Sequence, residues 1–431
     1  MKWIIFSPEL FFFISIIAFF LLSMAGRPNR GRDHIAAICM AGIATVISLA
    51  GLRSEGVLFA GTYRVDLFSQ VFKILLSIGL FLTVCICTDL DGIEARRHPE
   101  FYLLLFTSTL AMMMLVSAAH FLTIYVALEL SSYSLYILVS LRKRRELGIE
   151  AGLKYFLVGV SASAIMLFGF ALLYGSIQAS DIQQLAQMLP GGIDRPVVVI
   201  GLLLTLCGFF FKLALFPFHF WAPDVYQGAP NQVAAYIATV SKVAAMAIIL
   251  RFVAVSGGKS AYLVHVLVTL SIVSMTVGNL AAIIQKDLKR LLAYSSIAHA
   301  GYVMIGILSM TSQGYAGTLF YAIAVLLMKF TSFLVLVMAT SNGENLMIAD
   351  LAGLHRRSPI LAMALMLSLF SLAGIPPTIG FTGKFLIFAA AMQKGYFTLV
   401  LIAMINVVIS LYYYLMVIKA AYLLEPAAEL P

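Results

Sequence analysis

The sequence has 431 residues, of which 62% are hydrophobic and only 11% are charged. Ordinary globular chains are about 25% charged and about 45–50% apolar, so this composition excludes a water-soluble protein of the same length. The formal net charge of +9 does not indicate a nucleic-acid partner, because Lys and Arg fall in short groups between apolar runs and not on one face. We therefore expect an all-α polytopic membrane protein that meets the lipid bilayer along most of its length.

Thirteen apolar runs are long enough to be transmembrane helices, since about 20 apolar residues cross the hydrocarbon core. The first run follows a single lysine and lacks a small-residue cleavage site, which favours a helix over a signal peptide. The runs lie at about 4–23, 34–51, 67–88, 101–117, 119–140, 151–176, 197–221, 232–254, 261–284, 291–310, 315–340, 359–392 and 396–421.

The distribution of Lys and Arg predicts the orientation. Loops after the odd-numbered spans hold fourteen of these residues, and the opposite side holds seven. Because basic loops stay in the cytoplasm, we expect a periplasmic N-terminus and a cytoplasmic C-terminus. The short basic loops and the absence of a transit peptide favour a bacterial cell inner membrane.

Five ionisable residues lie well inside predicted spans: Glu129, Lys212, Lys242, Lys329 and Lys384. Facing lipid, each would cost about 2.5–3.5 kcal/mol, or roughly 12–18 kcal/mol together. This cost predicts that they face one another or a hydrated cavity, as in a path for protons or ions. The alternative, a structural ion pair, accounts for Glu129 and one lysine only.

Four other titratable residues are less informative. Lys73, Lys154 and Lys419 lie near span ends, where a long side chain reaches the headgroups, and Lys154 is the most ambiguous of the three. His299 is central in span 10 and suits either proton transfer or an ordinary buried hydrogen bond. The seven Lys and Arg residues left out of the two loop counts are all lysines. A desolvated lysine, unlike arginine, releases its proton near neutral pH.

Two spans are interrupted next to these lysines. Pro217 follows Lys212 in span 7, and Gly374, Pro376 and Pro377 interrupt span 12 before Lys384. Proline frees backbone carbonyls, which a membrane tolerates only where protein or water satisfies them.

The two interrupted spans are five apart, so spans 4–8 and 9–13 are predicted to be inverted repeats, which usually flank a transport site. The expected divisions are an N-terminal three-helix segment (1–98), a first five-helix repeat (99–254), a second, inverted repeat (255–421) and a short tail (422–431).

These motifs resemble one known family, the antiporter-like membrane subunits of respiratory complex I, and its N type most closely. The most specific segment is 209–230, FFFKLALFPFHFWAPDVYQGAP. The L and M types and the multisubunit sodium/proton antiporters usually carry His-Thr-Trp-Leu-Pro-Asp-Ala there. Further agreement lies at 8–9, 127–130, 289–299 and 372–377.

The resemblance implies roles for individual residues. Glu129 would pair with Lys212, Lys242 would be the central relay, and Lys384 would serve the outer half-channel. The family pattern has fourteen helices against thirteen here, and Lys329 stands where a neutral or polar residue is expected.

The resemblance also implies a proton-translocating subunit of NADH:quinone oxidoreductase, coupled to quinone reduction. It would hold no cofactor or metal of its own, because FMN, iron–sulfur clusters and quinone are bound by other subunits, and its neighbours would be M-like and K-like subunits. Two alternatives stay open: the equivalent subunit of a ferredoxin-, deazaflavin- or hydrogenase-linked complex, and a multisubunit cation/proton antiporter.

Overall fold

The computed structural model of the chain describes residues 5–25, 29–90, 92–143, 145–189, 192–193, 195–256, 260–340 and 343–425. Lys2, Arg27, Arg144 and Lys259 of the orientation count, and most of the predicted tail, lie outside these ranges. The elements are α1 (Ser7–Met24), α2 (Arg30–Ala50), β1 (Gly56–Leu58), β2 (Tyr63–Val65), α3 (Leu67–Cys85), α4 (His98–Ser117), α5 (Phe121–Ser140), α6 (Arg145–Ile177), α7 (Ile182–Met188), α8 (Pro196–Leu213), α9 (Trp221–Gly228), α10 (Asn231–Ala238), α11 (Val240–Ser256), α12 (Ala261–Ile283), α13 (Leu288–Leu308), α14 (Ser312–Ala339), α15 (Leu354–Arg357), α16 (Pro359–Ala373), α17 (Ile379–Gln393) and α18 (Phe397–Leu423).

The predicted all-α membrane architecture is confirmed. Among the described residues, twelve helical segments are long and apolar enough to cross a membrane. The remaining predicted span, the twelfth, consists of two shorter apolar helices, α16 and α17. Each of the thirteen apolar runs therefore corresponds to one helix or to two consecutive helices.

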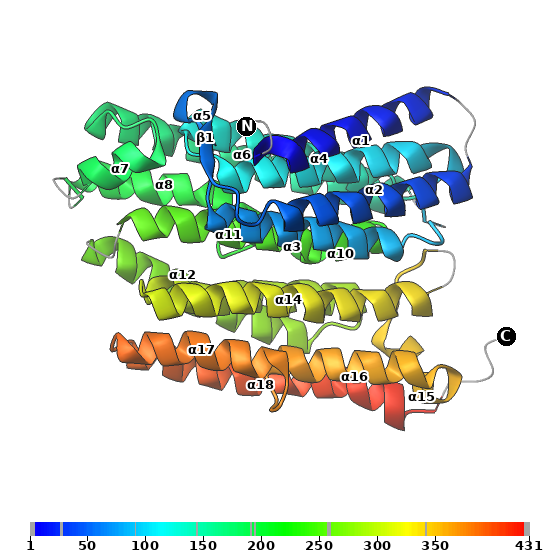
Figure 1. Cartoon of the computed structure of the whole chain (residues 1–431). Helices are drawn as coiled ribbons and strands as arrows, with labels where there is room; N and C mark the ends of the chain where they lie inside the picture. Colours follow the sequence, from blue (N-terminus) through cyan, green and yellow to red (C-terminus); the bar gives the residue numbers. More distant parts are fainter. Residues whose placement is uncertain are drawn as a thin grey trace.

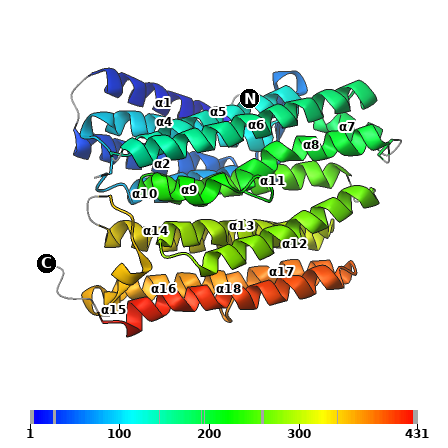
Figure 2. The ribbon, with the colours of Figure 1, turned by 180° about the vertical axis from the view of Figure 1, so that it is seen from behind.

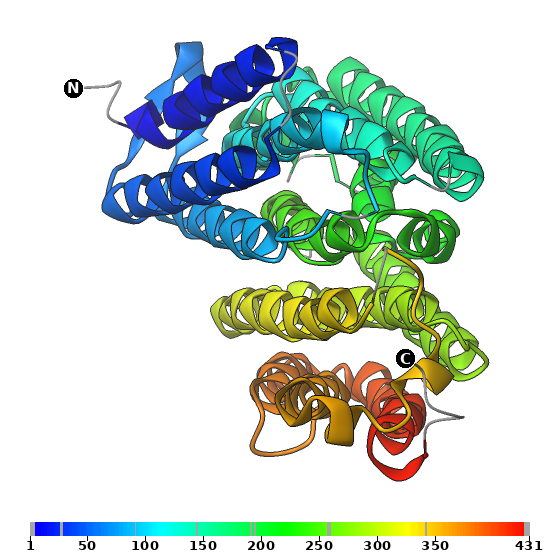
Figure 3. The ribbon, with the colours of Figure 1, turned by 90° about the vertical axis from the view of Figure 1, so that its right-hand side faces the viewer.

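The spanning helices run roughly side by side in two blocks (Figures 1 and 2). Helices α1–α11 form the first block, and α12–α18 form the second. Seen along the bundle, the second block lies beside the first and does not surround it (Figure 3). The blocks meet where α9 and α10 pack against α13 and α14. The two blocks are therefore in direct contact through these four helices.

Side-chain caps set the start of several helices. Asp66 accepts a hydrogen bond from the backbone N–H of Ser69 and opens α3, and Asp287 accepts one from Arg290 and opens α13. Thr311 caps α14 in the same way. Each cap satisfies a backbone donor that the first helical turn leaves free. Capping at Asp287 places His299 near the middle of α13.

Spans 7 and 12 are interrupted as predicted, and span 8 contains a third irregularity. Thr239 separates α10 from α11, with φ −115° and ψ −78°, although its backbone N–H still donates to the Ala235 carbonyl. The sequence did not indicate this irregularity, since it has neither Pro nor Gly there. The irregularity stands one turn before Lys242.

The prediction that Lys73 reaches the membrane surface was wrong. Its side chain is fully buried, and its Nζ lies 2.6 Å from Oε1 of Glu9 on α1. Tyr63 on β2 donates a 2.7 Å hydrogen bond to the same carboxylate oxygen. This cluster ties α1, α3 and the β1–β2 hairpin together. Lys419, by contrast, is exposed on α18, as expected near a span end.

The buried Glu9–Lys73 pair predicts a non-additive effect on stability. Lys73→Met leaves the carboxylate buried without its cation, which costs about 3–5 kcal/mol when a buried pair is broken on one side. The double variant Glu9→Gln/Lys73→Met removes both charges and should recover most of this loss. Thermal unfolding in detergent checks both variants. Equal unfolding temperatures for the single variant and the native protein would contradict the assignment.

Candidate functional site

Lys242 lies at the carboxyl end of a broken helix. Helix α8 ends at Leu213, because Ala214 adopts a left-handed conformation (φ 58°) and leaves backbone carbonyls without helical partners. From α11, the Lys242 Nζ donates to the carbonyls of Leu213 at 2.7 Å and Lys212 at 3.3 Å. The partial negative charge of a helix C-terminus stabilises a cation at this position.

Lys384 occupies the equivalent place at the second break. Helix α16 ends at Ala373, followed by Gly374 at φ 86°. The Lys384 Nζ, from α17, donates to the carbonyls of Leu372 at 2.8 Å and Ala373 at 3.0 Å. It also lies 4.8 Å from the centre of the Tyr302 ring. A lysine at a helix C-terminus is therefore found in both halves of the chain.

The two breaks share backbone features as well. Ala214 and Gly374 are both left-handed, and both breaks contain a cis peptide bond before proline, at Phe216–Pro217 and at Pro376–Pro377. Aromatic rings cover both ammonium groups, since Lys242 lies 4.9 Å from the centre of the Trp221 ring. A left-handed residue and an aromatic ring over the ammonium are therefore found at both breaks.

The expected ion pair between Glu129 and Lys212 is not formed. The Lys212 Nζ donates instead to Oγ of Ser131 at 2.8 Å and of Ser132 at 3.1 Å, both on α5. Glu129, one residue before Ser131, is 6% exposed, and its Oε1 has no hydrogen-bond partner in the described part of the chain. The charge of Glu129 acts on Lys212 without a direct contact between the two groups. The buried carboxylate therefore has an unused acceptor close to the ammonium.

Lys329 and His299 belong to one polar cluster in the second block. The Lys329 Nζ donates to the Leu292 carbonyl at 2.9 Å and to Ser295 Oγ at 2.6 Å. The His299 Nδ1 lies 2.5 Å from the Tyr321 hydroxyl. All of these side chains are buried. The sequence singled out both residues without indicating that they lie in one cluster.

Electrostatic interactions order the predicted residues into a row. The charge of each member acts on the next member of the row. At the end of the row, the charge of Lys384 acts on His299. The lysines of the row do not form ion pairs with any carboxylate that the structure describes. The ion pairs found among the described residues involve other Lys and Arg residues. The order is Glu129, Lys212, Lys242, Lys329, His299 and Lys384.

Lys154, the weakest of the predicted candidates, does not join this row. Its side chain is 45% exposed and its Nζ pairs with Glu150 at 2.7 Å and with Asp224 at 2.8 Å. Asp224 on α9 also pairs with Arg290 on α13 at 2.7 Å. Lys154 therefore belongs to a surface network that joins the two blocks.

Two buried cations were missed by sequence reasoning. Lys289 is fully buried at the start of α13, and its Nζ donates to the Ala229 carbonyl at 2.9 Å. Arg142 is 3% exposed and donates to the carbonyls of Gln227 and Gly343. Both were counted as loop residues, because a hydropathy pattern does not show that their side chains contact the carbonyls at the end of α9. The only signal the sequence contains is a group of basic residues in each of the two loops, at 142–145 and at 286–290.

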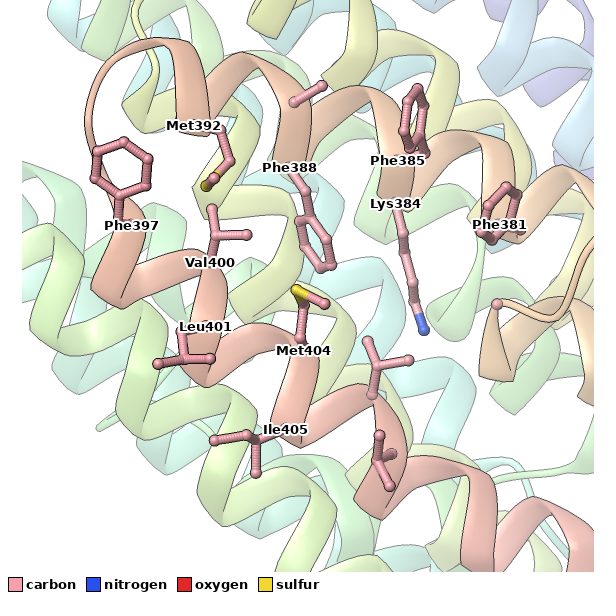
Figure 4. Close-up of a pocket in the computed structure, with 14 residues that line it drawn as sticks. Phe381, Lys384, Phe385, Phe388, Met392, Phe397, Val400, Leu401, Met404 and Ile405 are labelled. Atoms are coloured by element: carbon pink, nitrogen blue, oxygen red, sulfur yellow. The ribbon is translucent and has the colours of Figure 1, made fainter.

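An apolar groove of about 800 Å³ between α17 and α18 has Lys384 at its edge. Figure 4 shows Lys384 projecting from α17 beside Phe388 and toward α18, which contributes Met404. Lys384 is the single charged residue among those that line this groove. No group of three or more His, Cys, Asp or Glu residues suited to a metal ion occurs within the described ranges.

Comparison with known proteins places this arrangement in a family. A family profile described as the NADH:quinone oxidoreductase/Mrp antiporter transmembrane region matches residues 118–410. The NADH-quinone oxidoreductase subunit N 2 of Syntrophobacter fumaroxidans is 65% identical over the whole chain and 91% of its own length. The chain belongs to this family, as a subunit N-type member. A subunit N 2 from Opitutus terrae is 40% identical over 98% of the chain and 89% of its own length.

Solved structures have the same fold as this chain. A chain of respiratory complex I from Thermus thermophilus matches with a TM-score of 0.86 and 36% identity, covering 98% of this chain and 91% of that one. A chain of the Mrp complex from Dietzia sp. DQ12-45-1b matches with a TM-score of 0.88 and 22% identity, covering 99% and 82%. The second match shows that this chain shares its fold with that chain of the Mrp complex.

The bridge at Asp224 predicts a small, pH-dependent loss of stability in Asp224→Asn. Burial alone would raise the pKa of Asp224, but hydrogen bonds and charge from Lys154 and Arg290 hold that pKa below its usual value. The carboxylate therefore stabilises the folded chain above its unfolded pKa, and the contribution is lost as the pH falls through the lowered value. Exposed pairs contribute about 0.2–1 kcal/mol each. In detergent, Asp224→Asn should unfold at a slightly lower temperature than the native protein at pH 7, and this difference should shrink as the pH is lowered. A difference that grows on acidification would contradict the bridge.

Proposed function

We propose that this N-type subunit moves protons across the membrane within a proton-translocating NADH:quinone oxidoreductase. The row of buried charges carries the proposal, above all Lys242 and Lys384 at the carboxyl ends of the two broken helices. Helix C-termini stabilise the ammonium groups without neutralising them, because each supplies only about half a charge. The protonation state of each lysine can therefore still change when a proton arrives at a neighbouring member of the row.

The proposed path runs along that row from the cytoplasmic side. Protons enter near Lys212, pass through water to Lys242 and leave by way of Lys384. Glu129 and Lys212 act as the switch, in which a rearrangement separates or joins the two charges. The bonds from Lys212 to Ser131 and Ser132, with Glu129 close by, support two alternative positions for this ammonium.

The remaining parts of the reaction belong to other subunits. FMN, iron–sulfur clusters and quinone would be bound elsewhere in the complex, and this chain would sit between M-like and K-like neighbours in a bacterial inner membrane. The N-terminus would be periplasmic and the C-terminus cytoplasmic. Quinone reduction elsewhere in the complex would supply the energy that drives the switch.

Replacing Lys212 or Lys242 with Ala should abolish proton translocation through this subunit. Each substitution removes the group that accepts and releases the proton at one position of the row. The matched control is Lys419→Ala, which removes an exposed lysine from α18. The proton-to-electron ratio of the assembled complex in membrane vesicles is the measurement. If both variants pump at the native ratio, the relay is wrong.

Gly374→Ala should impair translocation by moving Lys384. A methyl group at Gly374 would lie 3.0 Å from Lys384 Cδ, and the left-handed backbone at φ 86° adds about 1–2 kcal/mol of strain. Gly395→Ala is the matched control, because Gly395 has φ 84° with open space around it. We expect similar losses of thermal stability, but a lower proton-to-electron ratio only in Gly374→Ala. Equal ratios in the two variants would contradict the role of the helix end.

A further inference from the structure

Two buried hydroxyl groups connect Lys329 with His299 in the second block. The Lys329 Nζ, on α14, donates a 2.6 Å hydrogen bond to Ser295 Oγ on α13. The Ser295 Oγ is hydrogen-bonded to the hydroxyl of Tyr414 on α18. That hydroxyl lies 3.4 Å from Nε2 of His299. A chain of direct contacts thus joins two titratable groups that come from different helices.

All four side chains in this hydrogen-bonded chain are buried. Lys329 and Ser295 are fully buried, and Tyr414 and His299 are 1% and 2% exposed. Each step is short enough for a direct hydrogen bond, at or within 3.4 Å. A proton that reaches Lys329 can therefore proceed toward His299 without a water molecule between these groups.

Ser295 is bonded differently from its neighbour on the same helix. Ser296 donates to the Leu292 carbonyl one turn earlier, which is how a serine inside a helix is commonly satisfied. Ser295 instead stands between an ammonium donor and a phenol. A serine and a tyrosine hydroxyl each donate one hydrogen bond while accepting another. Both side chains therefore have the chemistry that passing a proton requires.

We propose that Ser295 and Tyr414 carry the proton from Lys329 to His299, which makes them proton-carrying residues of the relay. This proposal rests on the proposed function and assigns a direct route within it. Lys329 releases a proton to Ser295 Oγ as the Ser295 hydroxyl proton moves to the Tyr414 oxygen. The Tyr414 hydroxyl proton then moves to Nε2 of His299. The net result is one proton gained by His299 and one lost by Lys329, with both hydroxyl groups again neutral.

His299 is arranged to receive and forward this proton. Its Nδ1 is held by the Tyr321 hydroxyl at 2.5 Å, which leaves Nε2 directed to Tyr414. Lys384 is the next cation in the row, and its charge acts on His299. After each transfer, rotation of the Ser295 and Tyr414 hydroxyl groups restores the starting direction of the hydrogen bonds. The route thus continues from Lys329 toward the end of α16.

The test removes one oxygen atom at a time. Tyr414→Phe and Ser295→Ala each break the chain, and their matched controls are Tyr236→Phe and Ser332→Ala. Tyr236 is buried with its hydroxyl hydrogen-bonded to Thr109, and Ser332 is buried with its hydroxyl bonded to Ser368. Positioned proton-transfer groups contribute about 10²–10⁴-fold to rate. We therefore expect both test variants to lower the proton-to-electron ratio of the assembled complex to that of Lys242→Ala, with the controls at the native ratio.

Three outcomes would overturn the proposal, and they are distinguishable. If Tyr414→Phe and Ser295→Ala pump at the native ratio while Lys242→Ala does not, the relay stands and this route is wrong. If Lys242→Ala also pumps at the native ratio, the proposed function fails and the route fails with it. The amount of assembled complex in the membranes is measured for every variant. A loss of assembly that accounts for the whole effect would assign the two hydroxyl groups a structural role and reject the proposal.

Discussion

The contact between a lysine ammonium and the free carbonyls at a helix C-terminus is the interaction on which the rest of this structure depends. An ammonium in the membrane interior is costly, and so is a helix end whose carbonyls lack donors. At Leu213 and at Ala373 the lysine ammonium donates to a free carbonyl, so that each group supplies the hydrogen-bond partner that the other lacks. The breaks in spans 7 and 12 and the lysines beside them are therefore one structural unit, repeated in the two blocks.

This pairing also determines how the charged row behaves. A carboxylate would neutralise each lysine and hold its proton, whereas a helix end supplies about half a charge. Glu129 is the only carboxylate in the row, and it lies at one end, beside a lysine that is bonded to two serines. Lys242 and Lys384 are stabilised by backbone carbonyls at helix ends and by aromatic rings, and Lys329 is bonded to a backbone carbonyl and a serine. Charge is consequently free to redistribute along the row when one member gains or loses a proton.

Sequence patterns predicted much of this arrangement, and the errors have physical causes. Hydropathy located all thirteen spans, because lipid imposes the same requirement on every one of them. Proline and glycine located the breaks in spans 7 and 12, but the irregularity at Thr239 has no such residue and was missed. Lys73 was assigned to the membrane surface, because its distance from the end of the span says nothing about Glu9 on another helix.

What the sequence by itself determined is local: which segments cross the membrane, which spans are interrupted and which charged residues lie too deep to face lipid. These follow from chain length, hydropathy and backbone chemistry, which need no knowledge of neighbouring helices. Only the tertiary structure decided the partners. Lys212 contacts serines and not Glu129, Lys329 contacts Ser295, and Tyr414 on the last helix reaches His299. Hydrogen bonds between helices depend on how helices distant in the sequence pack and turn, which hydropathy and residue spacing along one chain do not specify.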